Sequence, residues 1–400
     1  MSQKLLRALV DWKAPLKQLK RNRTAVPQLF SSPECVSAGG AVSAAVIDFR
    51  EYCAPGREKE LSDFLYKASH MVANTAQKHA RVVALTTSHG TNLQAGMVEG
   101  LVRSLSKELA GKGGVVNMIN VTNDSKDARV GACDFFASDG AAFVNGQRVD
   151  IEQPDRKSLE YYENRAKGKA VVTGAARGIG FETVKELKRL GFDVYGVDHP
   201  GGDFTALEKL GVEGVVKVDV TDESSGNVIG DKVGGDVNLM VHAAGITRDK
   251  TMKRMKPNLW DDVLSVNLFA IQRIDQQLIE SGVYNNGARI IGISSTSGVA
   301  GNLGQGNYAA SKSGLIGYIE DMNGKHEEFS WNNVAPGFIK TDMTANLPLI
   351  NEVVTTRVLT PLMTMGEPDD VAGVIGWLGV GGKGVRGQTV RVCGGMLAGR

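Results

Sequence analysis

Short apolar runs alternate with amphipathic segments along most of the chain. In the first part this pattern predicts buried strands over 41–49, 81–86 and 115–121, and helices over 57–79 and 96–110. Strands that alternate with helices are typical of α/β domains with parallel sheets. We therefore expect an α/β domain in the first part of the chain.

A polar, charged stretch then interrupts the alternation. Residues 151–167 (IEQPDRKSLEYYENRAK) are typical of an interdomain linker. After them the apolar strands AVVTG, DVYGVD, VVKVDV, LMVHAAG, RIIGISS and NNVAPG each precede a helical or loop segment. This order predicts a doubly wound parallel sheet, the Rossmann architecture, over 168–400. A smaller, degenerate, flavodoxin-like α/β domain would occupy 35–150, after an N-terminal arm over 1–34.

The two parts resemble each other in the order of their elements. The runs RVVALTT, GLVRSLSKELAGKGGVVNMINV and CDFFASDGAAFVNGQRVDI parallel RIIGISS, GLIGYIEDM with WNNVAPG, and VIGWLGVGGKGVRGQTVRVCG. With Gly100 set against Gly317, the first copy has Thr and Ala in place of Tyr308 and Lys312. The first domain would then be a shortened relative of the second without its chemical groups. The alternative is that any two α/β domains share such patterns.

Composition excludes several classes of protein. With 42% hydrophobic and 22% charged residues and a net charge of +2, the chain has neither the signature of disorder nor that of a nucleic-acid surface. The four cysteines share no C-x-x-C spacing, so we predict no metal site and no disulfide framework, and we expect a cytoplasmic location. No apolar run is long enough to span a membrane. The basic first 23 residues predict a solvated arm, with an organelle-targeting helix as the alternative.

A Gly-rich turn opens the second domain between a predicted strand and a predicted helix. Residues 173–180 read TGAARGIG, which gives the spacing G-x-x-x-G-x-G. Such a turn presents unhindered backbone N–H groups and the positive end of a helix dipole to a pyrophosphate. We therefore expect a dinucleotide to contact Gly174, Arg177, Gly178, Ile179 and Gly180.

Asp198 ends the next strand, 24 residues after Gly174. A carboxylate there accepts both hydroxyls of an adenosine ribose and repels a 2′-phosphate, which favours NAD over NADP. Arg177 favours the opposite, because a guanidinium pairs with phosphate; we give more weight to Asp198, whose charge faces the ribose edge. The alternative for Asp198 is an ordinary turn residue. Asp219 closes the third strand and is expected at the adenine amine, with Val220 beside it.

Tyr308 and Lys312 are four residues apart in NYAASKSG, so on a helix they share one face. A nearby ammonium lowers the pKa of a phenol from about 10, because it favours the phenolate. Tyr308 would then donate a proton to a carbonyl oxygen as hydride reaches the carbon. Taken alone, such a pair is also typical of an exposed helix face. Ser295 favours the catalytic interpretation, because it ends a strand where open α/β sheets bind ligands.

Together these residues resemble the signature of the short-chain dehydrogenases/reductases. The segments AAGITRDK (243–250), NYAASKSG and APGFIKTDMT (335–344), with Asn267, resemble the family's 3-oxoacyl-[acyl-carrier-protein] reductases. The extra first domain makes the whole chain similar to their two-domain, high-molecular-weight form. The resemblance covers residues 168–400.

The resemblance implies reduction of the β-ketone of 3-oxoacyl thioesters, carried by CoA or an acyl carrier protein, in fatty acid biosynthesis. NADH would supply the hydride, with NADPH as the alternative, and the enzyme would be a homo-oligomer, most simply a dimer. Tyr308 would be the general acid, Lys312 would bind the nicotinamide ribose, and Ser295 would hold the substrate oxygen. Asn267 would anchor a proton-relaying water. The residues that would border the nicotinamide and substrate are Ala244, Gly245, Pro336, Gly337 and Thr341.

The chain departs from the family pattern at several places. Ala243 replaces the usual Asn of the N-A-G motif, so one side chain that braces the backbone is missing, and His242 before it is expected in the core. Gly324 lies where an unbroken interface helix is expected. A basic run over 248–256 would attract the phosphates of CoA or an acidic carrier, or else form a solvated helix face. The alternative functions are another dehydrogenase activity, such as that on 3-hydroxyacyl-CoA, and a catalytically weak scaffold subunit.

Overall fold

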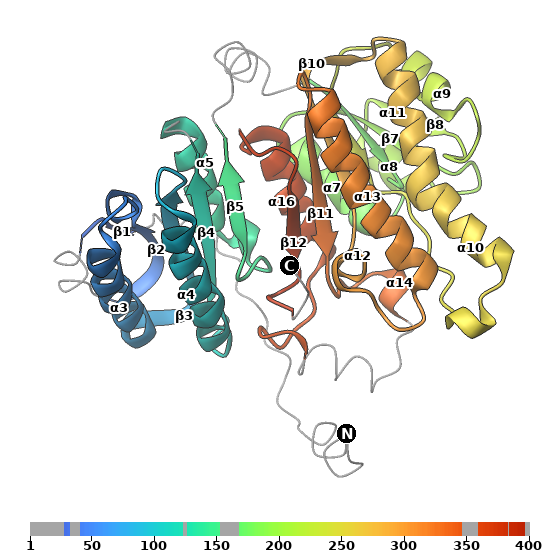
Figure 1. The fold of residues 1–400 in the computed structure, drawn as a ribbon. Coiled ribbons are helices and arrows are strands. Elements are labelled where there is room, and N and C mark those ends of the chain that lie inside the picture. Colours follow the sequence, from blue (N-terminus) through green and yellow to red (C-terminus); the bar gives the residue numbers. More distant parts are fainter. Residues whose placement is uncertain are drawn as a thin grey trace. The chain divides into compact units, whose positions relative to one another are not determined.

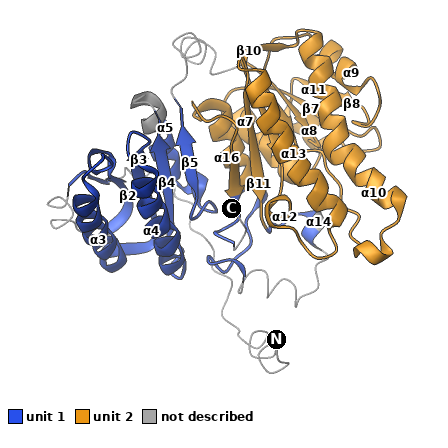
Figure 2. Cartoon of the chain, in the orientation of Figure 1, with its two compact units in different colours: residues 1–153, 338–370, 392–397 blue, residues 154–337, 371–391, 398–400 orange. Residues whose placement is uncertain are grey.

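The computed structural model describes residues 28–32, 41–122, 126–152, 168–345, 359–382 and 384–396 (Figure 1). The chain divides into two compact units (Figure 2). The first contains residues 1–153, 338–370 and 392–397, and the second contains 154–337, 371–391 and 398–400. The segments 338–370 and 392–397, which the sequence places in the second domain, thus group with the first. No helix in the described ranges has the length and apolar character needed to cross a membrane.

The first unit is built on a five-stranded parallel sheet in the order β1-β2-β3-β4-β5. β4 is buried along its whole length, as expected for a central strand covered on both faces. The strands are β1 (Gln28–Phe30), β2 (Val42–Asp48), β3 (Ala76–Thr87), β4 (Val115–Val121) and β5 (Arg148–Ile151). The helices are η1 (Arg50–Tyr52), α3 (Glu58–Thr75), α4 (Asn92–Ala110), α5 (Lys126–Phe136) and η2 (Asp139–Ala141).

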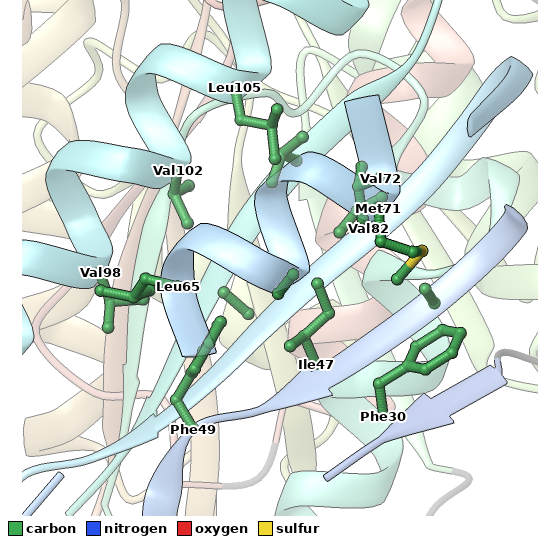
Figure 3. Close-up of a cluster of buried hydrophobic side chains, with 14 of the residues drawn as sticks. Phe30, Ile47, Phe49, Leu65, Met71, Val72, Val82, Val98, Val102 and Leu105 are labelled. Carbon is green, nitrogen blue, oxygen red and sulfur yellow. The ribbon is translucent and has the colours of Figure 1, made fainter. Parts of the chain in front are cut away.

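The apolar faces of α3 and α4 form the core of this unit over the sheet (Figure 3). On α3 the buried side chains recur at the helical period, from Leu61 through Leu65 and Ala68 to Val72. The cluster includes Leu65 of α3, the side chains Val98, Val102 and Leu105 of α4, and Phe49, which directly follows β2 (Figure 3). The helical pattern read from the sequence therefore marks the face that is buried.

Two boundaries in the first unit differ from the prediction. The helix expected to reach residue 79 ends at Thr75, and β3 follows directly, because Ala76 pairs with Val42 of the neighbouring strand. Residues 28–30, assigned to the arm, form the edge strand β1 beside β2, and Phe30 is buried. Ile151, assigned to the linker, ends β5. The rest of the linker from residue 153 and the arm up to residue 27 lie outside the described residues.

The second unit is built on a seven-stranded sheet in the order β12-β11-β10-β9-β6-β7-β8, in which the neighbouring strands from β11 to β8 are parallel. Because β6 is the first of these strands in the sequence, the order reverses between β6 and β9, and the sheet is doubly wound as predicted. The strands are β6 (Lys169–Thr173), β7 (Asp193–Asp198), β8 (Gly214–Lys217), β9 (Val237–His242), β10 (Tyr284–Ile293), β11 (Ser330–Pro336) and β12 (Thr389–Val392).

Helices connect these strands, and α13 runs unbroken through Gly324 to Lys325. The order β3-α4-β4-α5-β5 of the first unit has a counterpart in β10, α13, β11, α16 and β12, with α12 and α14 in addition. Because α/β domains in general share this order, the internal repeat stays a prediction. The helices are α7 (Gly178–Arg189), α8 (Thr205–Leu210), α9 (Ser225–Val233), η3 (Met252–Arg254), α10 (Pro257–Leu264), the π-helical turn η4 (Ser265–Phe269), α11 (Ala270–Glu280), α12 (Thr296–Ala300), α13 (Gly306–Lys325) and α16 (Pro368–Val380). The short helix α14 (Asp342–Ala345) lies in the segment 338–370, which belongs to the first unit.

Candidate active site

The Gly-rich turn joins the end of β6 to the start of α7. Gly174 adopts a left-handed backbone with φ 65°, and a Cβ there would lie 2.8 Å from the backbone of Ala244. A Cβ at Gly180 would overlap the carbonyl oxygen of Gly174. No described side chain caps α7, so its first-turn N–H groups, including that of Ile179, are open to a ligand. The turn therefore fits a pyrophosphate.

The corresponding helix of the first unit begins differently. Thr91 Oγ1 accepts a hydrogen bond from the Gln94 backbone, and Gln94 Oε1 accepts one from the Thr91 backbone. This capping box satisfies two N–H groups that a phosphate would otherwise bind. The start of α4 is therefore closed by the protein's own side chains.

Asp198 lies at the Gly-rich turn and fixes its shape. Its Oδ2 accepts a 2.8 Å hydrogen bond from the Ala176 backbone, and its Oδ1 accepts one of 2.8 Å from the His199 backbone. The carboxylate thus acts as a turn residue and carries a negative charge at the end of β7. Arg177 is exposed at the same turn, in extended backbone before α7.

Asp219 follows β8 and is held by Thr221, whose backbone N–H and hydroxyl donate hydrogen bonds of 2.9 Å and 2.7 Å to Oδ1. Burial raises the pKa of Asp219, but the bonds from Thr221 and the nearby His199 outweigh it, so the pKa lies below its usual value. The adjacent Val220 carbonyl accepts a hydrogen bond from Ser225. These two residues therefore form an ordered loop after β8.

The end of β9 is braced by a residue that the sequence interpretation missed. Thr173 Oγ1 accepts hydrogen bonds of 3.1 Å and 3.2 Å from the backbones of Ala243 and Ala244. Thr173 therefore supplies a brace where the motif's Asn is absent. Its place at the end of β6, next to β9, is the signal that would have found it. Beyond this brace, a Cβ at Gly245 would lie 3.4 Å from Lys312 Nζ.

His242 lies in the core, as expected, within a buried polar network. Its Nε2 is 2.9 Å from Asp275 Oδ1, which also accepts a 2.7 Å hydrogen bond from the Tyr284 hydroxyl. Asp275 Oδ2 accepts a 3.1 Å bond from Tyr318. Burial, followed by the charge of Asp275, raises the pKa of both tyrosines. The network ties β9, β10, α11 and α13 together beneath the site.

Ser295, Tyr308 and Lys312 come together after β10. Ser295 caps α12, where its Oγ accepts a 3.1 Å bond from the Ser297 backbone, and its side chain also hydrogen-bonds with Tyr308. Tyr308 and Lys312 lie one turn apart on α13, with Nζ 5.8 Å from the Tyr308 ring centroid. Lys312 is buried, and its Nζ donates a 2.7 Å bond to the Ile293 carbonyl.

The electrostatics of this triad differ from the prediction. Burial raises the pKa of Tyr308, against the lowering effect of the Ser295 hydrogen bond, and the charge of Asp249 raises it further. Burial also lowers the pKa of Lys312 to about 8. The expectation that Lys312 makes the phenol acidic is therefore wrong for this structure, because the cost of burying a phenolate dominates.

Asn267 lies in the π-helical turn η4 between α10 and α11. Its Oδ1 accepts a 2.9 Å bond from the Ile246 backbone, and its Nδ2 donates to the Ile246 carbonyl at 3.0 Å and to Ser311 Oγ at 3.1 Å. The residue thus fastens the loop after β9 to α13 at an irregular turn. Its binding of a water stays a prediction. The role of Ser311, one residue before Lys312, was not predicted.

The remaining predicted residues lie in both units. Pro336 ends β11, and Gly337 is the last residue of that segment in the second unit. Thr341 belongs to the first unit, where its N–H donates a 3.0 Å bond to Thr344 Oγ1. The basic run over 248–256 forms a loop and the single turn η3, so it is not a helix face, and its Lys and Arg side chains are exposed.

Comparisons with known proteins agree with this geometry. A family model described as short chain dehydrogenase matches residues 168–350. The 3-oxoacyl-[acyl-carrier-protein] reductase FabG of Vibrio harveyi is 36% identical over 236 residues, 57% of this chain and 96% of the relative. Its namesake from Pseudomonas aeruginosa is 38% identical over 238 residues, again 57% and 96%. That of Thermotoga maritima is 36% identical over 248 residues, 58% and 99%. On these matches, the chain belongs to the short-chain dehydrogenase family.

Proposed function

We propose that this protein reduces the β-ketone of 3-oxoacyl thioesters to a 3-hydroxyl group, with NADH as the hydride donor. The observation that carries the proposal is the meeting of Ser295, Tyr308 and Lys312 beyond β10, at the carboxyl edge of the sheet. The relatives named 3-oxoacyl-[acyl-carrier-protein] reductase, which match over nearly their whole length, support the substrate class.

The turn after β6 supports a dinucleotide as the coenzyme. The absence of a Cβ at Gly174 and Gly180 leaves the backbone approachable, and the uncapped start of α7 offers N–H groups to a pyrophosphate. The carboxylate of Asp198 supports NADH, because it would repel the 2′-phosphate of NADPH. A bound reduced nicotinamide supplies hydride to the ketone carbon.

The raised pKa of Tyr308 suits it to act in the direction of reduction. At neutral pH the phenol stays protonated, which is the form that gives a proton to the ketone oxygen as the alcohol forms. The Ser295 hydroxyl, which hydrogen-bonds with this phenol, would hold the same oxygen. Lys312 is cationic below a pKa of about 8 and would bind the nicotinamide ribose. A water held near Asn267 would return the proton.

The decisive test is turnover of acetoacetyl-CoA with NADH and with NADPH, in the parent and in Tyr308→Phe. Loss of the hydroxyl should lower kcat by about 10²–10⁴-fold and leave the Kd for NADH unchanged, because the ring still packs. Tyr66→Phe changes an exposed tyrosine of the first unit and serves as the matched control. Undiminished ketone consumption by Tyr308→Phe would refute the mechanism.

Two further measurements separate the alternatives. Oxidation of 3-hydroxybutyryl-CoA that outpaces ketone reduction at neutral pH would identify a 3-hydroxyacyl-CoA dehydrogenase instead. A fluorescence titration in which the protein fails to bind either reduced nicotinamide coenzyme would identify a scaffold. The same turnover assay with an acyl carrier thioester in place of CoA would name the preferred carrier.

A further inference from the structure

Phe143 of the first unit is enclosed by residues from the far end of the chain. It lies in the loop between η2 and β5, and only 1% of its surface is exposed. A Cβ at Gly366 would lie 2.5 Å from its Cδ1, and a Cβ at Gly394 would lie 2.7 Å from its Cε2. The two edges of the ring therefore contact two glycine backbones, with no space for a side chain at either one.

Backbone bonds fix this loop on both sides. The Phe143 carbonyl accepts a 2.8 Å hydrogen bond from Gly394 N–H. Two residues later, the buried Asn145 accepts a 2.9 Å bond from the Val116 backbone and donates one of 3.1 Å to the Ser106 carbonyl. Phe143 is thus presented by a loop that is anchored to β4 and α4.

Gly366, on one edge of the ring, is itself paired with the residues that directly follow Gly337 in the chain. Its N–H donates a 2.9 Å bond to the Phe338 carbonyl, and its carbonyl accepts one of 2.9 Å from Lys340 N–H. Ile339, between these two partners, is 3% exposed. A residue that contacts Gly366 therefore also fixes the course of the chain just after β11.

A buried charge lies near the other end of the same segment. Arg81 pairs with Asp139 at 3.1 Å, and both side chains are less than a tenth exposed. The carboxylate of Asp370, at the start of α16, adds to the favourable field at Arg81. Asp370 also accepts a 2.8 Å bond from Glu367 N–H, which leads back to Gly366. The first unit thus contacts the segment at Gly366 through Phe143 and places a favourable charge, that of Arg81, near Asp370.

We propose that residues 1–153 of the first unit position the chain segment that follows strand β11, with Phe143 as the positioning residue. The segment carries Thr341, which the sequence predicts at the border of the substrate pocket. In this view the first domain acts on substrate binding without contributing a reactive group. The proposed function gives the first domain no role, and this inference supplies one. Only the kinetic test of the inference rests on the proposed function.

Hydrogen exchange on the full chain, followed by mass spectrometry, tests the proposal without an activity assay. Phe143→Ala should speed exchange at least about tenfold in peptides that contain Lys340 and Gly366, because those amides lose their support. Phe64→Ala is the matched control, since Phe64 is equally buried in the same unit but packs against Phe49 and Tyr52. Equal acceleration by both variants, or none by Phe143→Ala, would overturn the proposal.

A second pair of variants keeps the test decisive if Phe143→Ala folds poorly. Gly366→Ala introduces a methyl group against the ring and should accelerate exchange in the same peptides. Combining it with Phe143→Leu removes the ring atoms that clash but leaves the contact of 2.6 Å with Ile339 Cδ1, so exchange should return part of the way toward the parent rate. An identical acceleration in the single and double variants would contradict the proposal.

Kinetics supply the functional readout. Phe143→Ala should raise KM for acetoacetyl-CoA several-fold while the Kd for NADH stays unchanged, and Phe143→Leu should restore most of the loss. A rise in the Kd for NADH equal to that in KM would indicate general damage and would contradict a positioning role. A parent protein without turnover would refute the proposed function, whereas the exchange comparison would still decide this inference.

Discussion

Lys312 Nζ lies 5.8 Å from the centroid of the Tyr308 ring and donates its 2.7 Å hydrogen bond to a backbone carbonyl, that of Ile293. No described carboxylate forms an ion pair with this ammonium, and burial alone lowers its pKa to about 8. A buried cation with so little compensation costs stability. We attribute its presence to the proposed role of Lys312 at the nicotinamide ribose rather than to folding.

Replacing Lys312 with Met should therefore separate activity from stability. Turnover should fall by at least about 10²-fold. At pH 7 the free energy of unfolding should rise by about 1–3 kcal/mol, because the desolvated charge is gone. Urea denaturation of parent, Lys312→Met and the exposed control Lys325→Met on the same helix measures the effect. A less stable Lys312→Met variant would show that the ammonium contributes net packing or bonding energy.

The stability difference between Lys312→Met and the parent should depend on pH, because the pKa of Lys312 is lowered in the folded protein. The unfolded chain binds the Lys312 proton more tightly than the folded one, so parent stability rises with pH between about 8 and 10.5. The stability advantage of Lys312→Met should be complete below pH 8 and should shrink as pH rises through this window. Urea denaturation midpoints of the parent and Lys312→Met at about pH 7 and about pH 9.5 test whether the difference shrinks with rising pH.

The rate of ketone reduction should also fall at high pH. The pH at which it falls should be set by the pKa of Lys312. Tyr308 stays protonated across the neutral range because its pKa is raised, whereas Lys312 loses its charge above about pH 8. We expect kcat to be level near neutrality and to fall as pH passes about 8. In Lys312→Arg the decrease in kcat should move to higher pH, since a guanidinium stays charged. If the decrease in kcat occurs at the same pH in Lys312→Arg as in the parent, it belongs to the titration of another group.

Coenzyme choice should depend on the charge of Asp198. Asp198→Asn keeps an oxygen that can accept the Ala176 N–H but removes the negative charge at the end of β7. The ratio of kcat/KM for NADH to that for NADPH should fall about tenfold, which corresponds to about 1.4 kcal/mol. Asp193→Asn changes a carboxylate at the opposite end of the same strand and should leave the ratio unchanged. An unchanged ratio in Asp198→Asn would remove the argument for NADH.

The sequence predicts the doubly wound sheet well, because that sheet depends on local patterns, and the roles of the candidate site residues stay predictions. Apolar runs separated by helical periods mark β6 to β11, and four-residue spacing places Tyr308 and Lys312 on one face. The end of α3 at Thr75 could not be predicted, since it depends on pairing of Ala76 with Val42, far away in the chain. Edge strand β1 is similarly defined by its partner.

The pKa values and the long-range hydrogen bonds of the site could not be predicted from the sequence, because they depend on contacts between elements that are distant in the chain. The pKa of Tyr308 depends on how completely the fold buries it, which spacing does not reveal. Thr173 braces Ala243 and Ala244 across 70 residues of chain, and the grouping of 338–370 with the first unit depends on contacts such as Phe143 with Gly366. Each of these features arises between elements rather than within one.

The buried network around Asp275 makes the sharpest stability prediction. One fully buried carboxylate accepts hydrogen bonds from two tyrosine hydroxyls and lies 2.9 Å from His242 Nε2. Asp275→Ala leaves all three groups without their acceptor and should lower the free energy of unfolding by about 3–5 kcal/mol. Asp275→Asn keeps one acceptor oxygen and should lose less. Asp321→Ala, exposed on α13, is the control. A loss below about 1 kcal/mol for Asp275→Ala would mean that the three groups find other partners, and that the network does not hold β9, α11 and α13 together.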